Sequence, residues 1–252
     1  MSGHSKWAQI KRQKGVSDVK KGLAFTKFSK AISIAVREGG GIGDPSQNFK
    51  LRLIIEKARE VNMPKENIER AIQRAVGKMS GEGLEEATYE GFGPGGAAVI
   101  VEAATDNKLR TSQEVKNIFD KSGGTLGNPG AVSYQFQSKG LVNVKKNGKT
   151  TDDIFLIAAD AGAEDVEEAG DEVLVYTKPE ELAKVKDALV DAGLTIENFE
   201  LTKKPIVTVA IDNVETAQKI IAFIEKLEVL DDVQKVYSNF DIPDSILQQL
   251  EN

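Results

Sequence analysis

One glycine-rich stretch has the spacing of a phosphate-binding loop. Residues 91–96, Gly-Phe-Gly-Pro-Gly-Gly, satisfy the G-x-G-x-x-G pattern of dinucleotide-binding sites. In such sites the stretch follows a strand and opens a helix, so that helix N–H groups meet the pyrophosphate. Here it precedes an apolar segment, 97–101, with the composition of a strand, and Pro94 removes one N–H donor. The context therefore favours a tight turn between two strands over a nucleotide site.

Few other residues could support catalysis or metal binding. His4 is the single histidine, and the chain has no cysteine. Zinc fingers, disulfides and thiol catalysis are thereby excluded. The acidic pairs at 164–165, 167–168, 171–172 and 231–232 lack the spacing of a calcium loop and indicate solvated faces. We therefore expect no catalytic residue, metal, cofactor or small-molecule substrate, and an enzyme that uses the glycine-rich turn is the weakest of three hypotheses.

Basic side chains are concentrated at the start of the chain. Residues 1–80 hold 17 Lys and Arg against 7 Asp and Glu, a net charge of +10, whereas the remainder holds 16 against 32. Within residues 1–37 there are nine basic residues and one acid, Asp18. Most charge runs are only solvated surface, but an excess confined to one block attracts polyanions. We predict that this block binds nucleic acid.

Eleven residues form the predicted nucleic-acid-binding surface. Lys20, Lys27 and Lys30 have spacings of seven and three, which return to nearly the same side of a helix and could follow a phosphate backbone. His4 could bond to a phosphate or a base, or be an exposed imidazole. Trp7 could stack on an unpaired base, although core packing is the commoner fate of a lone Trp. The complete set is His4, Lys6, Trp7, Lys11, Arg12, Lys14, Lys20, Lys21, Lys27, Lys30 and Arg37.

The first 80 residues have the periodicity of a small helical bundle. Apolar residues recur every three to four positions, a glycine run at 39–41 ends one helix, and Pro64 stands at the first position of another. The predicted helices are a short one around Trp7 and Ile10, then 18–38, 47–62 and 64–77. Residues 78–84 form a linker. If the lysine row does not bind, the third long helix offers Arg70 and Arg74 instead.

Beyond the linker the pattern alternates between strands and helices. An outer part spells strand–helix–strand twice, and the segment inserted in it does the same, which predicts two nested ferredoxin-like units. In the outer part we expect strands at 97–104, 132–136, 206–211 and 233–237, a helix at 111–121 capped by Thr111 and Glu114, and a helix from Asn213 to about 226. In the inner part we expect strands at 141–145, 164–167, 173–176 and 195–201, a helix at 152–161, and a helix through 192 capped by Thr177 and Glu180.

The sequence thus predicts an α+β protein of three domains. They are a basic helical domain at 1–80, a ferredoxin-like α+β domain at 81–136 plus 204–252, and an inserted ferredoxin-like α+β domain at 137–203. No apolar run is long enough to span a bilayer, and the N-terminus lacks the apolar core of a signal peptide. We expect a cytoplasmic protein with no membrane partner.

Several short motifs are spread along the chain, namely Gly3-His4-Ser5-Lys6-Trp7, Phe25-Thr26-Lys27, the stretch 89–96, Asp106-Asn107, Arg110-Thr111, the stretch 123–127 and the stretch 232–237. These motifs resemble those of the YebC family, which includes the mitochondrial translational activator of cytochrome oxidase. The resemblance extends from Gly3 to about Asp241 and implies a helical domain followed by two α+β domains, one inserted in the other, in a cytoplasmic protein that is not an enzyme.

Two functions follow from this resemblance. Family members are commonly described as probable transcriptional regulators that bind DNA, and others resemble translation factors that act on the ribosome and ease difficult stretches such as proline runs. The chain departs from the family at Lys21-Gly22-Leu23, usually Arg-Gly-Lys, and at 106–110, where Lys108 replaces Arg. Such changes keep a phosphate contact but lose a bidentate one. Charge without an evident dimeric recognition helix slightly favours RNA, so rRNA in the ribosome is the first hypothesis and DNA the second.

Overall fold

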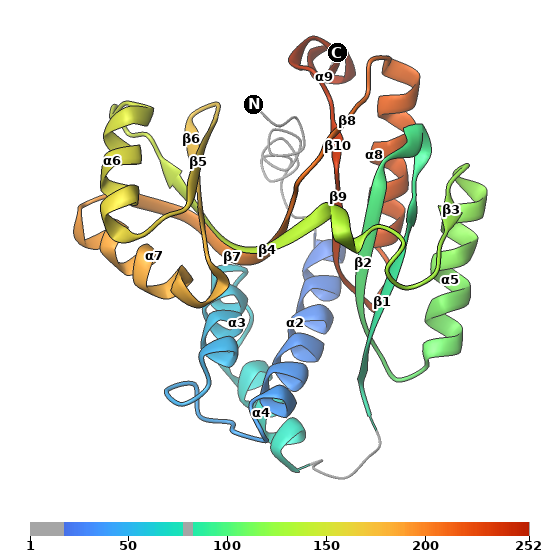
Figure 1. Ribbon diagram of the computed structural model, residues 1–252. Coiled ribbons are helices and arrows are strands. Elements are labelled where there is room, and N and C mark those ends of the chain that lie inside the picture. Colours follow the sequence, from blue (N-terminus) through green and yellow to red (C-terminus); the bar gives the residue numbers. More distant parts are fainter. Residues whose placement is uncertain (1–17, 78–82, 252) are drawn as a thin grey trace. The chain divides into compact units, whose positions relative to one another are not determined.

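The computed structural model describes residues 18–77 and 83–251, which fall into two compact units (Figure 1). The first unit combines the described parts of Lys14–Val132 with Glu215–Val236, and the second combines Ser133–Val214 with Tyr237–Asn252. Each contains α-helices and an open, four-stranded antiparallel sheet, so the predicted α+β class is confirmed. None of the described helices is long and apolar enough to cross a membrane.

Three helices of the first unit form where apolar periodicity predicts them. They are α2 (Asp18–Glu38), α3 (Phe49–Glu60) and α4 (Lys65–Gly77). The chain leaves α2 through Gly40 and Gly41, whose φ angles of 71° and 85° suit glycine. Pro64 stands just before α4 rather than inside it, since its carbonyl accepts the first helical N–H bonds. The shared core of the three helices includes Ile32, Ala35, Leu51, Ile55, Ala58, Met63, Ile68 and Ala71.

The sheet of the first unit carries the glycine-rich turn. Its strand order is β3 (Thr125–Leu126), β1 (Glu85–Phe92), β2 (Ala98–Thr105) and β9 (Val233–Ser238). β1 and β2 form an antiparallel hairpin joined by a short 3-10 turn at Pro94–Gly96, with φ of 75° and 77° at Gly95 and Gly96. The stretch 91–96 therefore connects two strands and opens no α-helix, which confirms the prediction of a turn.

Two helices, α5 (Lys108–Lys121) and α8 (Val214–Glu228), cover one face of this sheet. Phe119 of α5 and Phe223 of α8 meet edge to face, with ring centroids 4.9 Å apart. Gly91 and Gly93 lie directly beneath these rings, where a Cβ would approach Phe119 and Phe223 to within 2.9 Å. The glycines thus let the two helices sit close to the sheet.

The second unit is built on the sheet order β5 (Asp165–Ala169), β6 (Glu172–Thr177), β4 (Phe136–Lys145) and β7 (Thr195–Pro205). All neighbours are antiparallel, and α6 (Thr151–Ala161) packs against α7 (Leu182–Asp191). A parallel pair, β8 (Val209–Ala210) with β10 (Phe240–Asp241), and α9 (Asp244–Glu251) complete the unit. Buried Asn239 donates to Gln135 Oε1 and to the Val207 carbonyl, both at 3.0 Å, and so joins three segments.

Both predicted Thr-x-x-Glu caps are wrong. Asn107 caps α5, because its Oδ1 accepts from the Arg110 N–H at 3.0 Å, and Thr111 lies inside the helix. Thr177 ends β6, and α7 begins only at Leu182 after a 3-10 turn. The Thr-x-x-Glu spacing is that of a capped helix start. In the folded chain, however, Thr111 lies within α5 and Thr177 ends β6, so neither residue stands at the N-cap of a helix.

Two predicted strands differ from the structure. The strand expected at 132–136 does not form, because Ser133–Gln135 is a 3-10 turn, and Phe136 instead begins β4, which continues through the strand expected at 141–145. Of the strand predicted at 206–211, only Val209–Ala210 pairs, because a neighbouring strand is present only there. The elements β3, β10 and α9 were not expected. The helix predicted around Trp7 and most of the linker at 78–84 lie outside the described residues.

Candidate nucleic-acid interface

The structure describes the side chains of three of the eleven predicted nucleic-acid-binding residues. These three, Lys27, Lys30 and Arg37, lie on α2. The remaining predictions concern side chains outside the described part of the chain, namely His4, Lys6, Trp7, Lys11, Arg12, Lys14, Lys20 and Lys21.

All three described cations already have partners within the first unit. Lys27 Nζ donates to the carbonyl of Glu228, the last residue of α8, at 2.5 Å. Arg37 lies 3.6 Å from Glu86 Oε2 on β1. The side chain of Lys30 is only 19% exposed and is paired with Asp232. The expectation of a freely exposed lysine row is therefore wrong for Lys27 and Lys30, and a phosphate would have to compete with protein groups for them.

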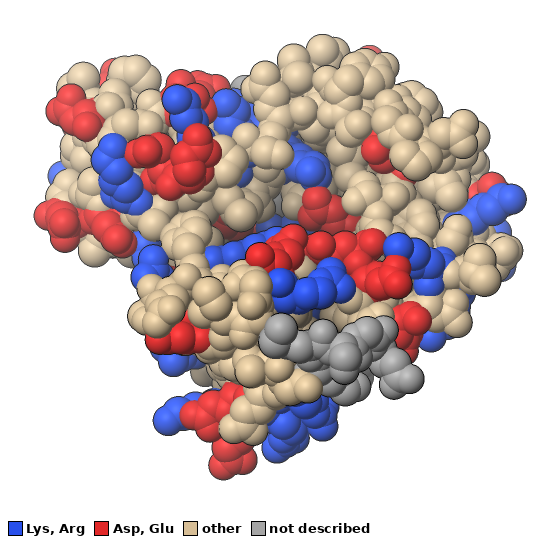
Figure 2. Space-filling model, turned by 60° about the horizontal axis from the view of Figure 1, so that its bottom comes forward, with Lys and Arg blue, Asp and Glu red and all other residues tan. Residues whose placement is uncertain are grey.

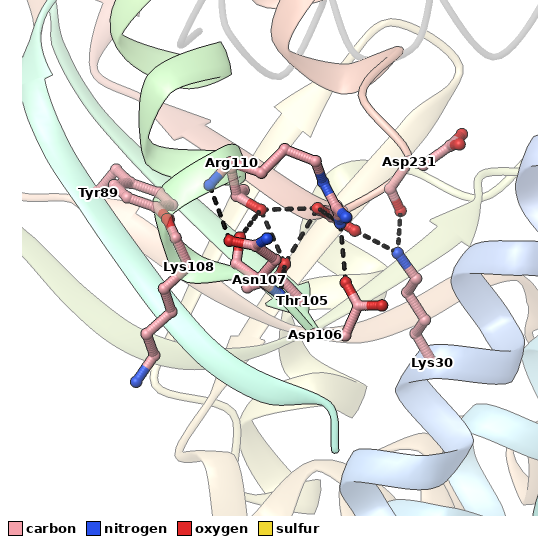
Figure 3. A network of polar contacts seen from close by, with 10 residues as sticks. Lys30, Tyr89, Thr105, Asp106, Asn107, Lys108, Arg110 and Asp231 are labelled. Atoms are coloured by element: carbon pink, nitrogen blue, oxygen red, sulfur yellow. Dashed lines mark hydrogen bonds and ion pairs between the residues drawn. The ribbon is translucent and has the colours of Figure 1, made fainter. Parts of the chain in front are cut away.

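Asp232, which directly precedes β9, is the centre of a polar network with residues of α2, β2 and α5. Figure 3 shows this network, with Lys30, Thr105 and Arg110 labelled. Its side chain is 5% exposed. Oδ1 accepts from Lys30 Nζ at 2.5 Å. Oδ2 lies 2.6 Å from Thr111 Oγ1, 2.8 Å from an Arg110 guanidinium nitrogen and 3.1 Å from Thr105 Oγ1. One buried carboxylate thus joins residues from α2, β2 and α5, and its nearest partner in sequence is 121 positions away.

The network keeps this carboxylate ionised. Burial alone would raise the pKa of Asp232, but hydrogen bonds from Lys30, Thr111 and Arg110 outweigh it and hold the pKa well below its ordinary value. In turn, hydrogen bonds to Asp232 and Asp106 raise the pKa of the Arg110 guanidinium. Two cations therefore share one fully charged, buried anion, and the side chain of Arg110 remains 46% exposed.

Local structure places each member of the network. The Ala104 N–H donates to the Asp232 carbonyl at 2.7 Å, which fixes the start of β9 against the end of β2. Asn107 donates its N–H to Thr105 Oγ1 at 2.9 Å while its side chain caps α5. Because α5 starts there, Arg110 and Thr111 lie in its first turn, where both donate to Asp232 Oδ2.

Two hollows border this region of the first unit. The smaller, of about 490 Å³, lies beside Lys30, Arg110 and Asp232. The larger, of about 1150 Å³, is a groove with walls from α2 and α4. Arg70 and Arg74 line the groove, are exposed, and make no ion pair or hydrogen bond with any residue in the described ranges.

Charges of both signs are interspersed on the face of the molecule in Figure 2, rather than forming an unbroken basic patch. Ion pairs of the first unit account for this mixture, because several cations lie next to carboxylates. Examples are Lys30–Asp232, Arg37–Glu86, Lys50–Glu38, Lys108–Glu85 and Arg110–Asp106. Cations without such partners are therefore the better candidates for a polyanion.

Two profiles of one protein family together match almost the whole chain. The profile of the TACO1/YebC protein N-terminal domain matches residues 5–78, and that of the TACO1/YebC second and third domain matches residues 84–240. The chain belongs to the TACO1/YebC family. The YebC resemblance seen in the sequence is thereby confirmed.

Several TACO1/YebC relatives match this chain from end to end. A probable transcriptional regulatory protein of Sulfurihydrogenibium sp. is 52% identical over 252 residues, and covers 100% of both chains. One from Dictyoglomus thermophilum is 50% identical over 251 residues, covering 99% of this chain and 100% of the relative. The crystal structure of a conserved hypothetical protein from Aquifex aeolicus has a TM-score of 0.83 and 46% identity, and the match covers 92% of this chain and 94% of that one.

Sequence reasoning about this TACO1/YebC chain missed the Asp232 network. The acidic pair at 231–232 was interpreted as a solvated face, yet Asp232 is buried and Asp231 exposed. Thr111 was interpreted as a helix cap. One signal was present, because Asp106-Asn107, Arg110-Thr111 and the stretch from 232 are all among the motifs that carry the family resemblance. Charge counting alone could not connect them.

Proposed function

We propose that this protein is a non-enzymatic regulator of gene expression that binds nucleic acid, and that its target is rRNA in the ribosome. The observation that carries the proposal is the excess of positive charge in residues 1–80, +10, in a chain whose net charge is −6. A polyanion is the partner that such a block attracts. The proposed contacts include the eleven residues from His4 to Arg37 named above, in a cytoplasmic protein that needs no metal or cofactor.

A second candidate function is binding of DNA as a transcriptional regulator. The names of the relatives favour it, since the Sulfurihydrogenibium and Dictyoglomus proteins are each called a probable transcriptional regulatory protein. Against it, the described part of the first unit offers a groove between helices rather than a projecting recognition helix of the kind that enters the DNA major groove. A positively charged groove is a common way for proteins to hold a single strand.

We also propose that the two sheets belong to ferredoxin-like domains, one inserted in the other, with the boundaries 81–136 plus 204–252 and 137–203. The second unit supports this, because its order β5-β6-β4-β7 with α6 and α7 is that of a split βαβ repeat. In the first unit β1 occupies the central position beside β2 that we expected the strand at 206–211 to take. The helical domain at 1–80 would be the third domain.

Sedimentation of the full-length protein with ribosomes, at low and high salt, tests the proposal. We expect the protein to move with ribosomes at low salt and to be released as salt rises, because each phosphate contact releases counterions. A gel-shift comparison with genomic DNA fragments serves as the competing arm. Sequence-specific retention on DNA without ribosome binding would favour the transcriptional regulator instead.

A further inference from the structure

The groove between α2 and α4 has cations on one wall that nothing in the described chain neutralises. Arg70 and Arg74 are one turn apart on α4, about 6 Å along the helix axis. Like charges at this spacing repel each other. Glu66, one turn before Arg70, is a possible ion-pair partner, but no such pair forms. A bound anion would relieve this repulsion.

The acidic residues of the groove do not cancel these charges. Glu85 and Asp106 also line it, but Glu85 pairs with Lys108 and Asp106 with Arg110 at 2.9 Å. The negative charge of each carboxylate is thus already neutralised by its own ion-pair partner. Four basic side chains line the groove, but Lys30 and Arg37 are paired with Asp232 and Glu86. Its uncompensated positive charge is therefore that of Arg70 and Arg74.

The α2 wall supplies hydrogen-bond acceptors instead of charge. Ser29 Oγ donates to the Phe25 carbonyl at 2.9 Å, and Ser33 Oγ donates to the Ser29 carbonyl at 3.0 Å. Since each hydroxyl proton is committed to the helix backbone, the oxygen lone pairs remain to accept from a ligand. Phe25 lines the groove beside these acceptors and is half-buried, because it also packs against the core of the three helices.

From this arrangement we infer that the α2–α4 groove binds a short single-stranded RNA segment. Arg70 and Arg74 contact successive phosphates, Ser29 and Ser33 accept hydrogen bonds from ribose 2′-hydroxyls, and a base stacks on Phe25. A positively charged groove with an aromatic platform is how proteins hold single strands, and the 2′-hydroxyl is the group that distinguishes RNA from DNA. The volume of about 1150 Å³ suits a few nucleotides of an unpaired strand. The inference rests on the proposed function, and it assigns a site outside the predicted lysine row.

The test compares two double variants of the full-length protein that lose equal charge. Arg70→Gln with Arg74→Gln removes the groove cations, whereas Arg52→Gln with Arg59→Gln neutralises exposed residues of α3 that do not line the groove. Affinity for an unstructured RNA of about 12 nucleotides is measured against salt concentration. We expect the groove variant to lose about tenfold in affinity and about 1.4 in salt slope, from two phosphate contacts, and the α3 variant to lose less than about threefold.

A second comparison tests the acceptors. Ser29→Ala with Ser33→Ala should bring the affinities for RNA and for DNA of the same sequence together, whereas wild type should prefer RNA. Melting curves confirm that each variant is folded. Equal losses in the two arginine variants, or a wild type that prefers duplex DNA, would overturn the groove assignment while nucleic-acid binding stands. A wild type that binds neither RNA nor ribosomes would instead refute the proposed function itself.

Discussion

Lys30 Nζ lies 2.5 Å from Asp232 Oδ1, although the two residues are 202 positions apart in the chain. Lys30 belongs to the basic helix α2, and Asp232 precedes the edge strand β9. The pair therefore links the helices of the first unit to its sheet. A cation that composition alone assigns to nucleic acid has a structural role as well.

Replacing the buried anion should destabilise the first unit. Asp232→Asn leaves Lys30 and Arg110 without their shared carboxylate, and we expect a loss of about 2–4 kcal/mol in the free energy of unfolding at pH 7. Urea unfolding measures it. Asp231→Asn is the matched control, because Asp231 is exposed and meets Lys30 only through its backbone carbonyl. Similar stability of both variants would contradict a central role for Asp232.

The same pair predicts how stability depends on pH. The pKa of Asp232 is depressed in the folded protein, so its contribution is complete above its unfolded pKa of about 3.9 and is lost as pH falls towards the folded value. The difference in unfolding free energy between wild type and Asp232→Asn should be constant from pH 7 to pH 5 and should shrink below about pH 4. A difference that persists unchanged at pH 3 would show that Asp232 does not titrate in this way.

Neutralising Lys30 should lower the stability of the folded protein, although the sequence predicts for this residue only a contact with nucleic acid. Lys30→Gln removes a charged hydrogen bond from a nearly buried carboxylate and should lower the free energy of unfolding by about 1.5–3 kcal/mol. Lys50→Gln is the comparison, since its ion pair with Glu38 is 44% and 39% exposed and should contribute less than about 1 kcal/mol. Chemical denaturation of both variants decides; no difference between them would reject the assignment.

Thr111 should matter for its hydroxyl rather than its shape. Its Oγ1 is 2.6 Å from Asp232 Oδ2 and the residue is fully buried. Thr111→Val keeps the volume but removes the donor, and we expect a loss of about 1.5–3 kcal/mol, whereas Thr111→Ser should retain most of the stability. Thermal melts of the two variants test this. If serine is as damaging as valine, packing of the methyl group is the more important contribution.

Gly91 should tolerate no side chain, for reasons of packing rather than phosphate binding. A Cβ there would collide with the Thr125 carbonyl and lie 2.7 Å from Phe119 Cε1. Gly91→Ala should cost about 1–3 kcal/mol. Gly22→Ala on α2, where a Cβ meets nothing within 4 Å, should instead stabilise by about 0.5–1 kcal/mol. Scanning calorimetry of both variants tests this, because only a glycine that has no room for a side chain should lose stability on replacement by alanine.

Local patterns in the sequence determined much of the secondary structure and indicated the class of partner that we propose. The helix over 18–38, the turn at 91–96 and the charge excess of residues 1–80 depend on neighbours a few positions away, so periodicity and composition reveal them. Tertiary structure decided the rest. Whether Thr111 caps a helix or meets a buried carboxylate depends on where residue 232 arrives, and whether 206–211 pairs depends on which strand lies beside it. These choices are made by contacts between distant segments, whose free energies no local spacing encodes.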